Sequence, residues 1–311
     1  MSPAPSLADA VAALRAGRLV AFPTETVYGL GADASRDDAI RAVFDAKGRP
    51  SDNPLIVHGA TLAALEPIAV FDARARRLAA TCWPGPLTLV LPAQPGVSSL
   101  VRAGLPTVAV RVPDHPVALA LLEQAGPLVA PSANRSGRPS PTTAQAVSAE
   151  LGTSVAMVLD GGPCRVGIES TVLDLSGPVA RILRPGAMDA ATLRGILDAD
   201  VIDASVGAAP EDAERPRAPG LKYRHYAPSV PVRIFPAPPA AGALPAGTLV
   251  LTTERHAASF DHADVVLVDS ASLYASFRRA EDESRPAIAV VAEASELPAA
   301  LWDRIQRAAR G

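Results

Sequence analysis

Residues 18–31 read RLVAFPTETVYGLG, and the predicted fold is built around this stretch. Its first part, RLVAFP, is a short apolar run that predicts a buried strand. The strand ends at Pro23, and Thr24, Glu25 and Thr26 follow at once. Loops behind strand ends are where open α/β sheets bind ligands. The stretch therefore predicts a strand that carries polar side chains to a binding site.

On both sides of this strand, apolar runs alternate with helical patterns. Strands are predicted at 54–58, 87–92, 107–113, 127–132, 155–162, 170–175 and 179–186. Helices are predicted at 6–17, 35–48, 72–82, 115–125 and 142–151, with Ser6 and Ser35 as N-caps of the first two. Strands in mixed alternation with helices indicate an α/β fold with a partly parallel sheet.

The periodic pattern stops between about residues 201 and 220, where VIDASVGAAPEDAERPRAPG is rich in turn formers. Strand-like runs and two helical patterns return beyond it, at 232–235, 247–253, 264–270, 272–280, 287–292 and 301–310. A chain of 311 residues is long enough for two domains. We therefore expect a first domain at 1–200, a linker at 201–229 and a smaller α/β domain at 230–311.

The composition is that of a globular protein, with 49% hydrophobic and 20% charged residues. A net charge of −3 argues against a surface that binds nucleic acid over its whole extent, but it does not exclude a local basic cleft. Cys82 and Cys164 form no CxxC pattern, which argues against a disulfide framework or a zinc site and suits a reducing cytosol. We find neither a signal-peptide pattern nor a membrane-length apolar run, and expect a soluble cytoplasmic protein.

Familiar nucleotide motifs are absent or weak. No GxxxxGK[ST] occurs, so an ordinary P-loop is not expected. Gly29 and Gly31, with Ala34 after them, match the dinucleotide fingerprint, but the preceding strand ends too early for its strand-turn-helix geometry. We favour the simpler interpretation, in which these glycines bend the backbone between strand and helix.

Three more segments place polar residues where the apolar pattern breaks. They are KGRPSDNPLIVH (47–58), PSANRSGRPSPTT (131–143) and GIESTVLDL (167–175). Structural explanations exist for single residues: Lys47 closes a helix, where a cation suits the helix dipole, and Thr142 could be a helix cap. His58 at a strand end is more often a core residue than a ligand. Arg111 is harder to explain, because a buried, unpaired guanidinium among valines is costly. A carboxylate suits its geometry best.

Together these segments identify a resemblance. The chain is similar to the YrdC/TsaC family of L-threonylcarbamoyladenylate synthases, in its longer two-domain form. The resemblance covers nearly the whole chain and rests on motifs that follow in the family's order. These are PTETVYGLG, KGRP followed by NPL, WPGPLTLVL, RVPDHP, PSANRSGRPSPTT, GIESTV, LRPGA and, at 219–228, PGLKYRHYAP.

The resemblance implies a fold, a reaction and partners. The first domain would be a twisted mixed sheet curled around a deep basic cavity, and the second a Rossmann-like α/β domain. As a nucleotidyltransferase, the protein would convert L-threonine, bicarbonate or CO2, and ATP to threonylcarbamoyl-AMP and pyrophosphate. Partner enzymes of the tRNA threonylcarbamoyl transferase machinery would then modify the adenosine beside the anticodon. Mg²⁺ would be carried by ATP, since no carboxylate cluster suggests a metal cage, and we name no metal ligands.

Site residues carry over by motif. The resemblance implies that L-threonine is bound by Thr26, His58, Arg111, Ser132 and Ser170. It implies that ATP is bound by Arg49, Asn53, Thr107, Asn134, Thr142 and Arg184. Lys47 and Arg49 would be the catalytic cations beside the phosphates. Catalysis would consist mainly of positioning and of neutralising charge on the phosphates.

KYRHYAP (222–228) holds one of the chain's two lysines, Lys222. A carbamate decomposes in open water, so the site should close while it exists. We expect this segment to act as a lid, with Lys222 and Arg224 toward phosphate and Tyr223 and Tyr226 over an apolar rim. The alternative is that these residues only dock the second domain.

Two other functions compete with this hypothesis. A double-stranded RNA-binding or ribosome-maturation factor could use the basic cavity, but the net charge and the absence of RNA-binding motifs argue against it. A related domain makes carbamoyl-adenylates in hydrogenase maturation, but those proteins carry acylphosphatase and zinc-finger segments that this chain lacks.

Overall fold

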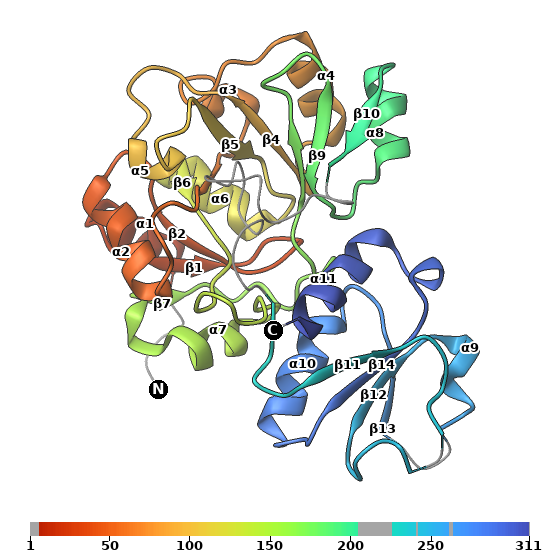
Figure 1. The fold of residues 1–311 in the computed structure, drawn as a ribbon. Coiled ribbons are helices and arrows are strands. Elements are labelled where there is room, and N and C mark those ends of the chain that lie inside the picture. Colours follow the sequence, from red (N-terminus) through yellow and green to blue (C-terminus); the bar gives the residue numbers. More distant parts are fainter. Residues whose placement is uncertain (1–5, 205–225, 241, 261–263, 311) are drawn as a thin grey trace. The chain divides into compact units, whose positions relative to one another are not determined.

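The computed structural model describes residues 6–204, 226–240, 242–260 and 264–310. The chain forms two compact units, and neither is continuous in sequence (Figure 1). Unit 1 comprises Met1–Ser136 and Pro141–Lys222, and unit 2 comprises Gly137–Ser140 and Tyr223–Gly311. Four residues of the first half of the chain thus belong to the second unit.

Unit 1 is built on a ten-stranded sheet whose strand order is β10-β9-β8-β4-β5-β3-β6-β2-β1-β7. The strands are β1 (Val20–Phe22), β2 (Gly29–Asp33), β3 (Ile56–His58), β4 (Leu87–Pro92), β5 (Thr107–Arg111), β6 (Leu128–Val129), β7 (Met157–Val158), β8 (Thr171–Asp174), β9 (Ala180–Arg184) and β10 (Val201–Asp203). Parallel pairs such as β3–β5 and β4–β8 stand beside antiparallel pairs such as β4–β5 and β8–β9. The prediction of a mixed α/β sheet is confirmed.

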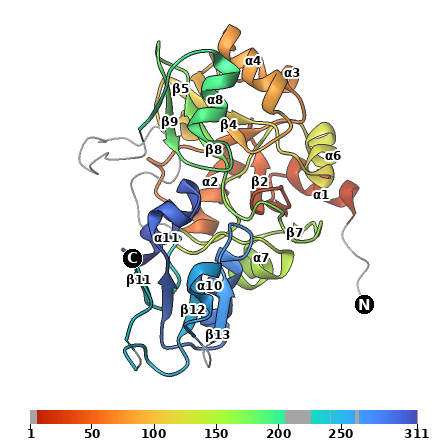
Figure 2. The same ribbon diagram turned by 90° about the vertical axis from the view of Figure 1, so that its right-hand side faces the viewer.

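The helices of unit 1 cover this sheet. They are α1 (Leu7–Arg15), α2 (Asp37–Lys47), α3 (Leu62–Leu65), α4 (Ala73–Cys82), α5 (Ser99–Arg102), α6 (Pro116–Ala125), α7 (Ala144–Leu151) and α8 (Ala190–Leu197). Helices α1 and α6 lie side by side, as Figure 2 shows, and pack with Val20, Phe22 and Leu128 in one apolar cluster. A larger cluster joins α2, α4 and α8 to the strands.

The helix ends show which local predictions hold. Ser6 caps α1 as expected, because its hydroxyl accepts a hydrogen bond from the Asp9 N–H. Ser35 does not cap α2, and that prediction was wrong: the N-cap position is Arg36, and the Ser35 hydroxyl donates to the carboxylate of Asp33 at 2.7 Å. Gly48 ends α2 in the left-handed conformation at φ +58°, which places Lys47 in the last helical turn.

Strand β2 was missed by the sequence analysis, which took Gly29 and Gly31 as a bend. Both glycines pair with β1 in antiparallel register, Gly31 with Val20 and Gly29 with Phe22. A side chain at residue 31 would meet the ring of Phe22 at 2.9 Å and the Val20 carbonyl oxygen at 3.1 Å. Glycine is required here because the Phe22 ring crosses the neighbouring strand.

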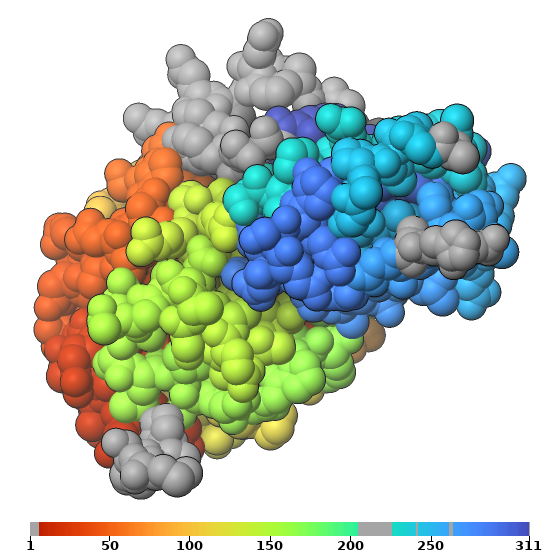
Figure 3. Space-filling view, turned by 90° about the horizontal axis from the view of Figure 1, so that it is seen from below, coloured from red at the N-terminus to blue at the C-terminus, as the bar shows by residue number. Residues whose placement is uncertain are grey.

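Unit 2 contains a parallel four-stranded sheet in the order β11-β14-β12-β13. Its elements are β11 (Val232–Phe235), β12 (Leu249–Thr252), α9 (Glu254–Ala257), β13 (Asp264–Leu267), α10 (Leu273–Asp282), β14 (Ile288–Val291) and α11 (Ala299–Ala309). The predicted strands and both predicted helices are confirmed. In the space-filling view these residues form a compact cyan-to-blue body (Figure 3).

The short segment Gly137–Ser140 is held in unit 2 by polar contacts. The two terminal nitrogens of Arg138 donate to the two carboxylate oxygens of Glu281 at 2.7 and 2.9 Å. The Ala227 N–H donates to the Gly137 carbonyl at 3.0 Å, and Arg278 donates to the carbonyl of Pro139. The bidentate contact between Arg138 and Glu281 has the geometry that an arginine and a carboxylate form best.

Within the described ranges, no helix combines the length and the apolar character needed to span a bilayer.

Candidate active site

One face of the unit 1 sheet carries a row of polar side chains that crosses several strands. His58 at the end of β3 is paired in register with Arg111 at the end of β5. Farther along the sheet, Thr88 on β4 is paired with Val172 on β8, which is paired with Arg184 on β9. Residues paired in register project to the same face of a sheet. Strand register therefore aligns residues that are more than 100 positions apart in sequence.

An apolar strip lies beside this row. Ile56, Val90, Ala109 and Val172 form a buried cluster separate from the main core. Thr107 starts β5, four residues before Arg111, and is paired with Pro92. Four strand residues span roughly 13 Å. Thr107, which the resemblance assigns to the nucleotide, therefore lies at the opposite end of β5 from Arg111, and its predicted nucleotide role stays a prediction.

Arg111 is buried and finds a carboxylate inside the chain. Its Nη2 atom lies 2.7 Å from Oε1 of Glu25, and both side chains are at most 5% exposed. Nη2 also donates to the hydroxyl of Thr26 at 2.9 Å, and Nε donates to the Gly85 carbonyl at 3.1 Å. Among the described residues, Nη1 makes no hydrogen bond. Glu25 thus supplies the carboxylate partner that a buried strand arginine needs, and the burial of Arg111 does not by itself require a ligand.

The hydroxyl of Thr26 lies in a local network of hydrogen bonds. The Thr24 hydroxyl donates to the Val27 carbonyl at 2.6 Å and accepts from the backbone N–H groups of Thr26 and Val27, both at 3.2 Å. The hydroxyls of Thr24 and Thr26 lie 2.8 Å apart, and either can be the donor in this contact. Since the Thr26 hydroxyl accepts from Arg111, it is held beside the guanidinium.

His58 is 3% exposed, and its Nδ1 atom has no hydrogen-bond partner in the described part of the chain. Burial, and then the nearby charge of Arg111, lower its pKa to about 3. The imidazole is therefore neutral near pH 7. A buried polar atom without a partner is uncommon, and it calls for an explanation such as a bound ligand.

Lys47 is brought to the loop after β6 by the end of α2. Its Nζ atom donates to the backbone carbonyls of Ser132 at 2.6 Å and Asn134 at 2.5 Å. Burial, and then the charge of Arg49, hold the pKa of Lys47 well below its ordinary value of 10.5. The helix-dipole explanation is incomplete, because this lysine fixes the backbone of a second predicted site segment.

The loop after Lys47 turns back on itself. The Arg49 guanidinium donates to the carbonyls of Asn53 at 3.3 Å and Pro54 at 2.9 Å. Asn53 is 1% exposed, and its Oδ1 has no partner among the described residues. This side-chain oxygen is therefore available to a hydrogen-bond donor of a ligand.

Ser170 and Arg184 meet at the other end of the polar row. Nε and Nη2 of Arg184 donate to the Ser170 carbonyl at 3.2 and 3.0 Å, and Nη2 lies 3.2 Å from the Ser170 hydroxyl. That hydroxyl is also 2.8 Å from the hydroxyl of Thr88. Both Ser170 and Arg184 are at most 4% exposed.

Asn134 and Thr142 lie on either side of the segment held in unit 2. Both are buried, at 5% and 6% exposure. Thr142 is not the helix cap, since the cap of α7 is Thr143, whose hydroxyl accepts from the Ala146 N–H. The cap explanation for Thr142 was wrong, and its predicted nucleotide role stays a prediction.

Of the four predicted lid residues, the structure describes Tyr226. Lys222, Tyr223 and Arg224 lie outside the described residues. Tyr226 does not cover an apolar rim: it is 5% exposed, stacks on Tyr274 with ring centroids 5.8 Å apart, and has the Arg304 guanidinium 4.9 Å from its ring centre. Its prediction as a rim residue was wrong, because α10 and α11 enclose its ring within unit 2.

Two buried groups that contact predicted site residues were not themselves assigned a site role by the sequence analysis. Glu25 and Thr88 are fully or almost fully buried, and they contact Arg111 and Ser170 respectively. Glu25 stood in a quoted motif, yet its partner could not be named without the register of β5. Thr88 and Val90 alternate along β4 and therefore share one face of the sheet. The sequence does not show which face of β4 is turned toward Ser170, so Thr88 could not be assigned to the site.

Among the described residues, no group of three or more His, Cys, Asp or Glu side chains is placed to hold a metal ion.

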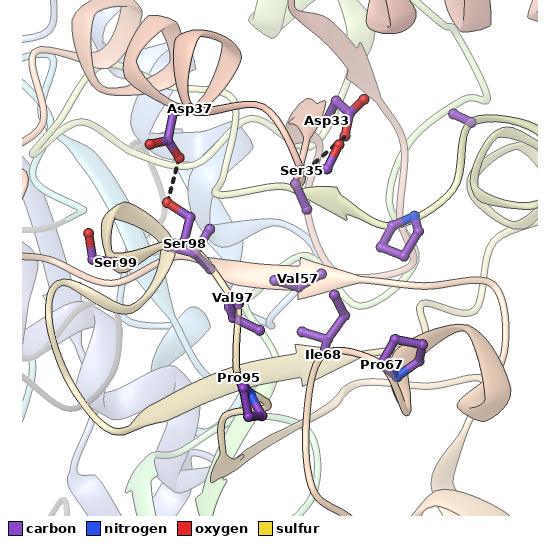
Figure 4. Close-up of a pocket in the computed structure, with 15 residues that line it drawn as sticks. Asp33, Ser35, Asp37, Val57, Pro67, Ile68, Pro95, Val97, Ser98 and Ser99 are labelled. Atoms are coloured by element: carbon purple, nitrogen blue, oxygen red, sulfur yellow. Dashed lines mark hydrogen bonds between the residues drawn. The ribbon is translucent and has the colours of Figure 1, made fainter.

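A cavity separate from the polar row has a volume of about 750 Å³. It opens near the C-terminal end of β2 and is lined by residues that include Asp33, Ser35, Asp37 and Ser98 (Figure 4). It contains none of the predicted site residues.

Comparison with known proteins identifies both parts of the chain. A family model for Sua5, YciO and YrdC, described as "Telomere recombination", matches residues 12–186, and one described as "Threonylcarbamoyl-AMP synthase, C-terminal domain" matches residues 189–310. Two proteins named threonylcarbamoyl-AMP synthase are similar. One from Bacillus subtilis is 47% identical over 233 residues, 74% of this chain, and one from Pyrococcus abyssi is 46% identical over 227 residues, 72% of this chain. The matched stretches span 66% of each relative's own length, just under two thirds.

A solved structure extends the likeness to almost the whole chain. It is described as P. abyssi Sua5 complexed with L-threonine, is 37% identical and has a TM-score of 0.87. The match covers 98% of this chain and 94% of that one. With one family model over more than half of its length and the C-terminal model over most of the rest, the chain belongs to the Sua5/YciO/YrdC family.

Proposed function

We propose that this protein is an L-threonylcarbamoyladenylate synthase, a nucleotidyltransferase that makes threonylcarbamoyl-AMP and pyrophosphate from L-threonine, bicarbonate or CO2, and ATP. The observation that carries the proposal is the burial of three basic side chains in unit 1, each in contact with a predicted site residue or loop: Lys47, Arg111 and Arg184 are all at most 4% exposed. Three buried cations beside one sheet suit a ligand with several anionic groups. Relatives named threonylcarbamoyl-AMP synthase and a threonine-bound Sua5 support the choice of reaction.

The amino-acid pocket is proposed around Thr26, His58 and Arg111, with Ser132 and Ser170 nearby. Nη1 of Arg111 carries two N–H groups that make no hydrogen bond with the described residues, and we assign the threonine carboxylate to it. Thr26, whose hydroxyl accepts from Arg111, would face the hydroxyl or the amine of the substrate. The neutral His58 adds a polar contact without adding charge.

The phosphates are proposed to lie toward Lys47, Arg49 and Arg184, and the nucleoside toward Asn53, Asn134 and Thr142. The deprotonated threonine amine adds to CO2 and releases one proton to solvent, and an oxygen of the resulting carbamate attacks the α-phosphorus of ATP, so that the bond to pyrophosphate breaks. The cations neutralise the charge that develops on the phosphates. Mg²⁺ enters as part of the ATP substrate and keeps several waters.

The wider setting is part of the same proposal. The product would be consumed in the cytoplasm by the machinery that transfers the threonylcarbamoyl group to tRNA, next to the anticodon.

One experiment tests the reaction. The full-length protein is incubated with ATP, L-threonine and bicarbonate, and threonylcarbamoyl-AMP is sought by mass spectrometry. Pyrophosphate release should require both threonine and bicarbonate. Release that needs neither, together with tight binding of duplex RNA, would instead support the RNA-binding alternative.

A further inference from the structure

We propose that Glu25 acts as a resident carboxylate: it pairs with Arg111 while the site is empty, and thereby limits how tightly the site holds the carboxylate of its amino-acid substrate. This inference rests on the proposed function, because it concerns the pocket assigned to L-threonine. It makes Glu25 a residue that sets affinity by acting on Arg111, without contacting the substrate itself.

The position of Glu25 is fixed from two sides. Oε1 lies 2.7 Å from Nη2 of Arg111, and Oε2 accepts a hydrogen bond from the Asp114 N–H at 3.1 Å. The side chain is 0% exposed. A carboxylate with an oxygen engaged on each side and no contact with water cannot turn away from Arg111.

The pairing with Arg111 is close but imperfect. Although Oε1 is near Nη2, it accepts no well-directed hydrogen bond from any described residue. The Nη2 atom donates instead to the hydroxyl of Thr26, and Nε donates to Gly85. The contact between Glu25 and Arg111 is thus mainly one of charge. A fold that used this pair only for stability would be expected to align it, because buried ion pairs compensate for lost hydration only with good geometry.

Two nitrogens of Arg111 therefore face the protein, and the third remains for a ligand. A substrate carboxylate at Nη1 would share one guanidinium with Glu25. Like charges on a shared, buried group repel one another, and the repulsion is screened less than in water. The negative charge of Glu25 should therefore weaken the binding of a second carboxylate while keeping the empty site stable.

The test is Glu25→Gln, which removes the charge and keeps the shape. The ligand-free variant should unfold at a lower temperature, because Arg111 loses its counter-ion. Its KM for L-threonine in pyrophosphate release should fall at least about threefold, and its KM for ATP should stay within about twofold of the wild-type value. The rise in melting temperature on adding threonine should be larger than in the wild type. An ordinary structural defect would raise the KM for threonine.

Three controls separate this effect from general damage. Calorimetry with L-threoninamide, which has no carboxylate, should show no tightening. In an Arg111→Met background, Glu25→Gln should no longer change the affinity for threonine. Glu296→Gln removes the acid of the Arg255–Glu296 pair in unit 2, and should leave both KM values unchanged.

The outcomes are decisive in either direction. A folded Glu25→Gln protein with an unchanged or raised KM for threonine, or with equal tightening for threoninamide, overturns the proposal. If that variant does not fold, Glu25→Asp keeps the charge but draws it away from Nη2, and should lower the KM for threonine by a smaller factor; no decrease there also overturns it. A wild-type protein without threonine-dependent pyrophosphate release would reject the proposed function instead.

Discussion

Replacing Arg111 with lysine should weaken threonine binding far more than ATP binding. The substitution removes the Nη1 donors assigned to the substrate carboxylate, and a charged hydrogen bond contributes about 1.5–3 kcal/mol. At about 1.4 kcal/mol for each tenfold change, the dissociation constant for threonine should rise roughly ten- to hundredfold. The hydrogen bonds from the charged guanidinium to Gly85 and Thr26 are lost as well, each at about the same 1.5–3 kcal/mol, so the free energy of unfolding should drop by about 3–6 kcal/mol.

Calorimetry with each ligand separately, and denaturant unfolding of the same samples, check this prediction. The lysine ammonium can still pair with Glu25, so the variant should fold. An equal loss of affinity for ATP would refute the assignment of Arg111 to threonine. Unchanged threonine affinity in a folded variant would do the same, and would return this arginine to a purely structural role.

Three other predictions follow from the structure. The pKa of His58 is about 3 in the folded protein and near 6.5 in the unfolded chain. The free energy of unfolding should therefore fall as the pH falls from 6.5 to about 3, by at most about 1.4 kcal/mol per pH unit. The His58→Gln variant should lack this pH-dependent loss of stability, and identical acid-unfolding curves for the two proteins would contradict the prediction. Alanine at Arg49 or at Asn134 should weaken ATP binding and leave threonine binding measurable. The Asn134 substitution should not release Lys47, because the hydrogen bond from Lys47 to Asn134 goes to the backbone carbonyl. Equal loss of both ligands would point to collapse of the loops. A chain ending at residue 205 keeps every strand of unit 1 and should fold, but should lose turnover in the pyrophosphate assay; normal turnover would show that unit 2 is dispensable.

Much of the fold could be predicted because its signals are local. The apolar run at 87–92 became β4 with the same limits, and the amphipathic run at 115–125 became α6 within one residue. Strand β2 could not be predicted in this way. Its two glycines have low intrinsic strand preference, and only the Phe22 ring on a paired strand explains them.

The site shows the same division. Lys47, Arg111 and Ser170 were identified as candidates because polar residues interrupt apolar patterns at element ends. Glu25 was not recognised as the partner of Arg111, since the two are 86 residues apart and meet only through tertiary packing. The rim role of Tyr226 was wrong for a related reason: its burial depends on α10 and α11, whose positions the linker sequence does not encode.

The segment Gly137–Ser140 has a consequence for how such proteins can be recombined. The chain enters unit 2 after Ser136, returns at Pro141 and enters again after Lys222. A chimera that joins two family members at a single point in the linker would take Arg138 from one parent and Glu281 from the other. Exchange of the second unit should therefore succeed only between parents that match at these two positions, or when the four-residue segment is transplanted with it.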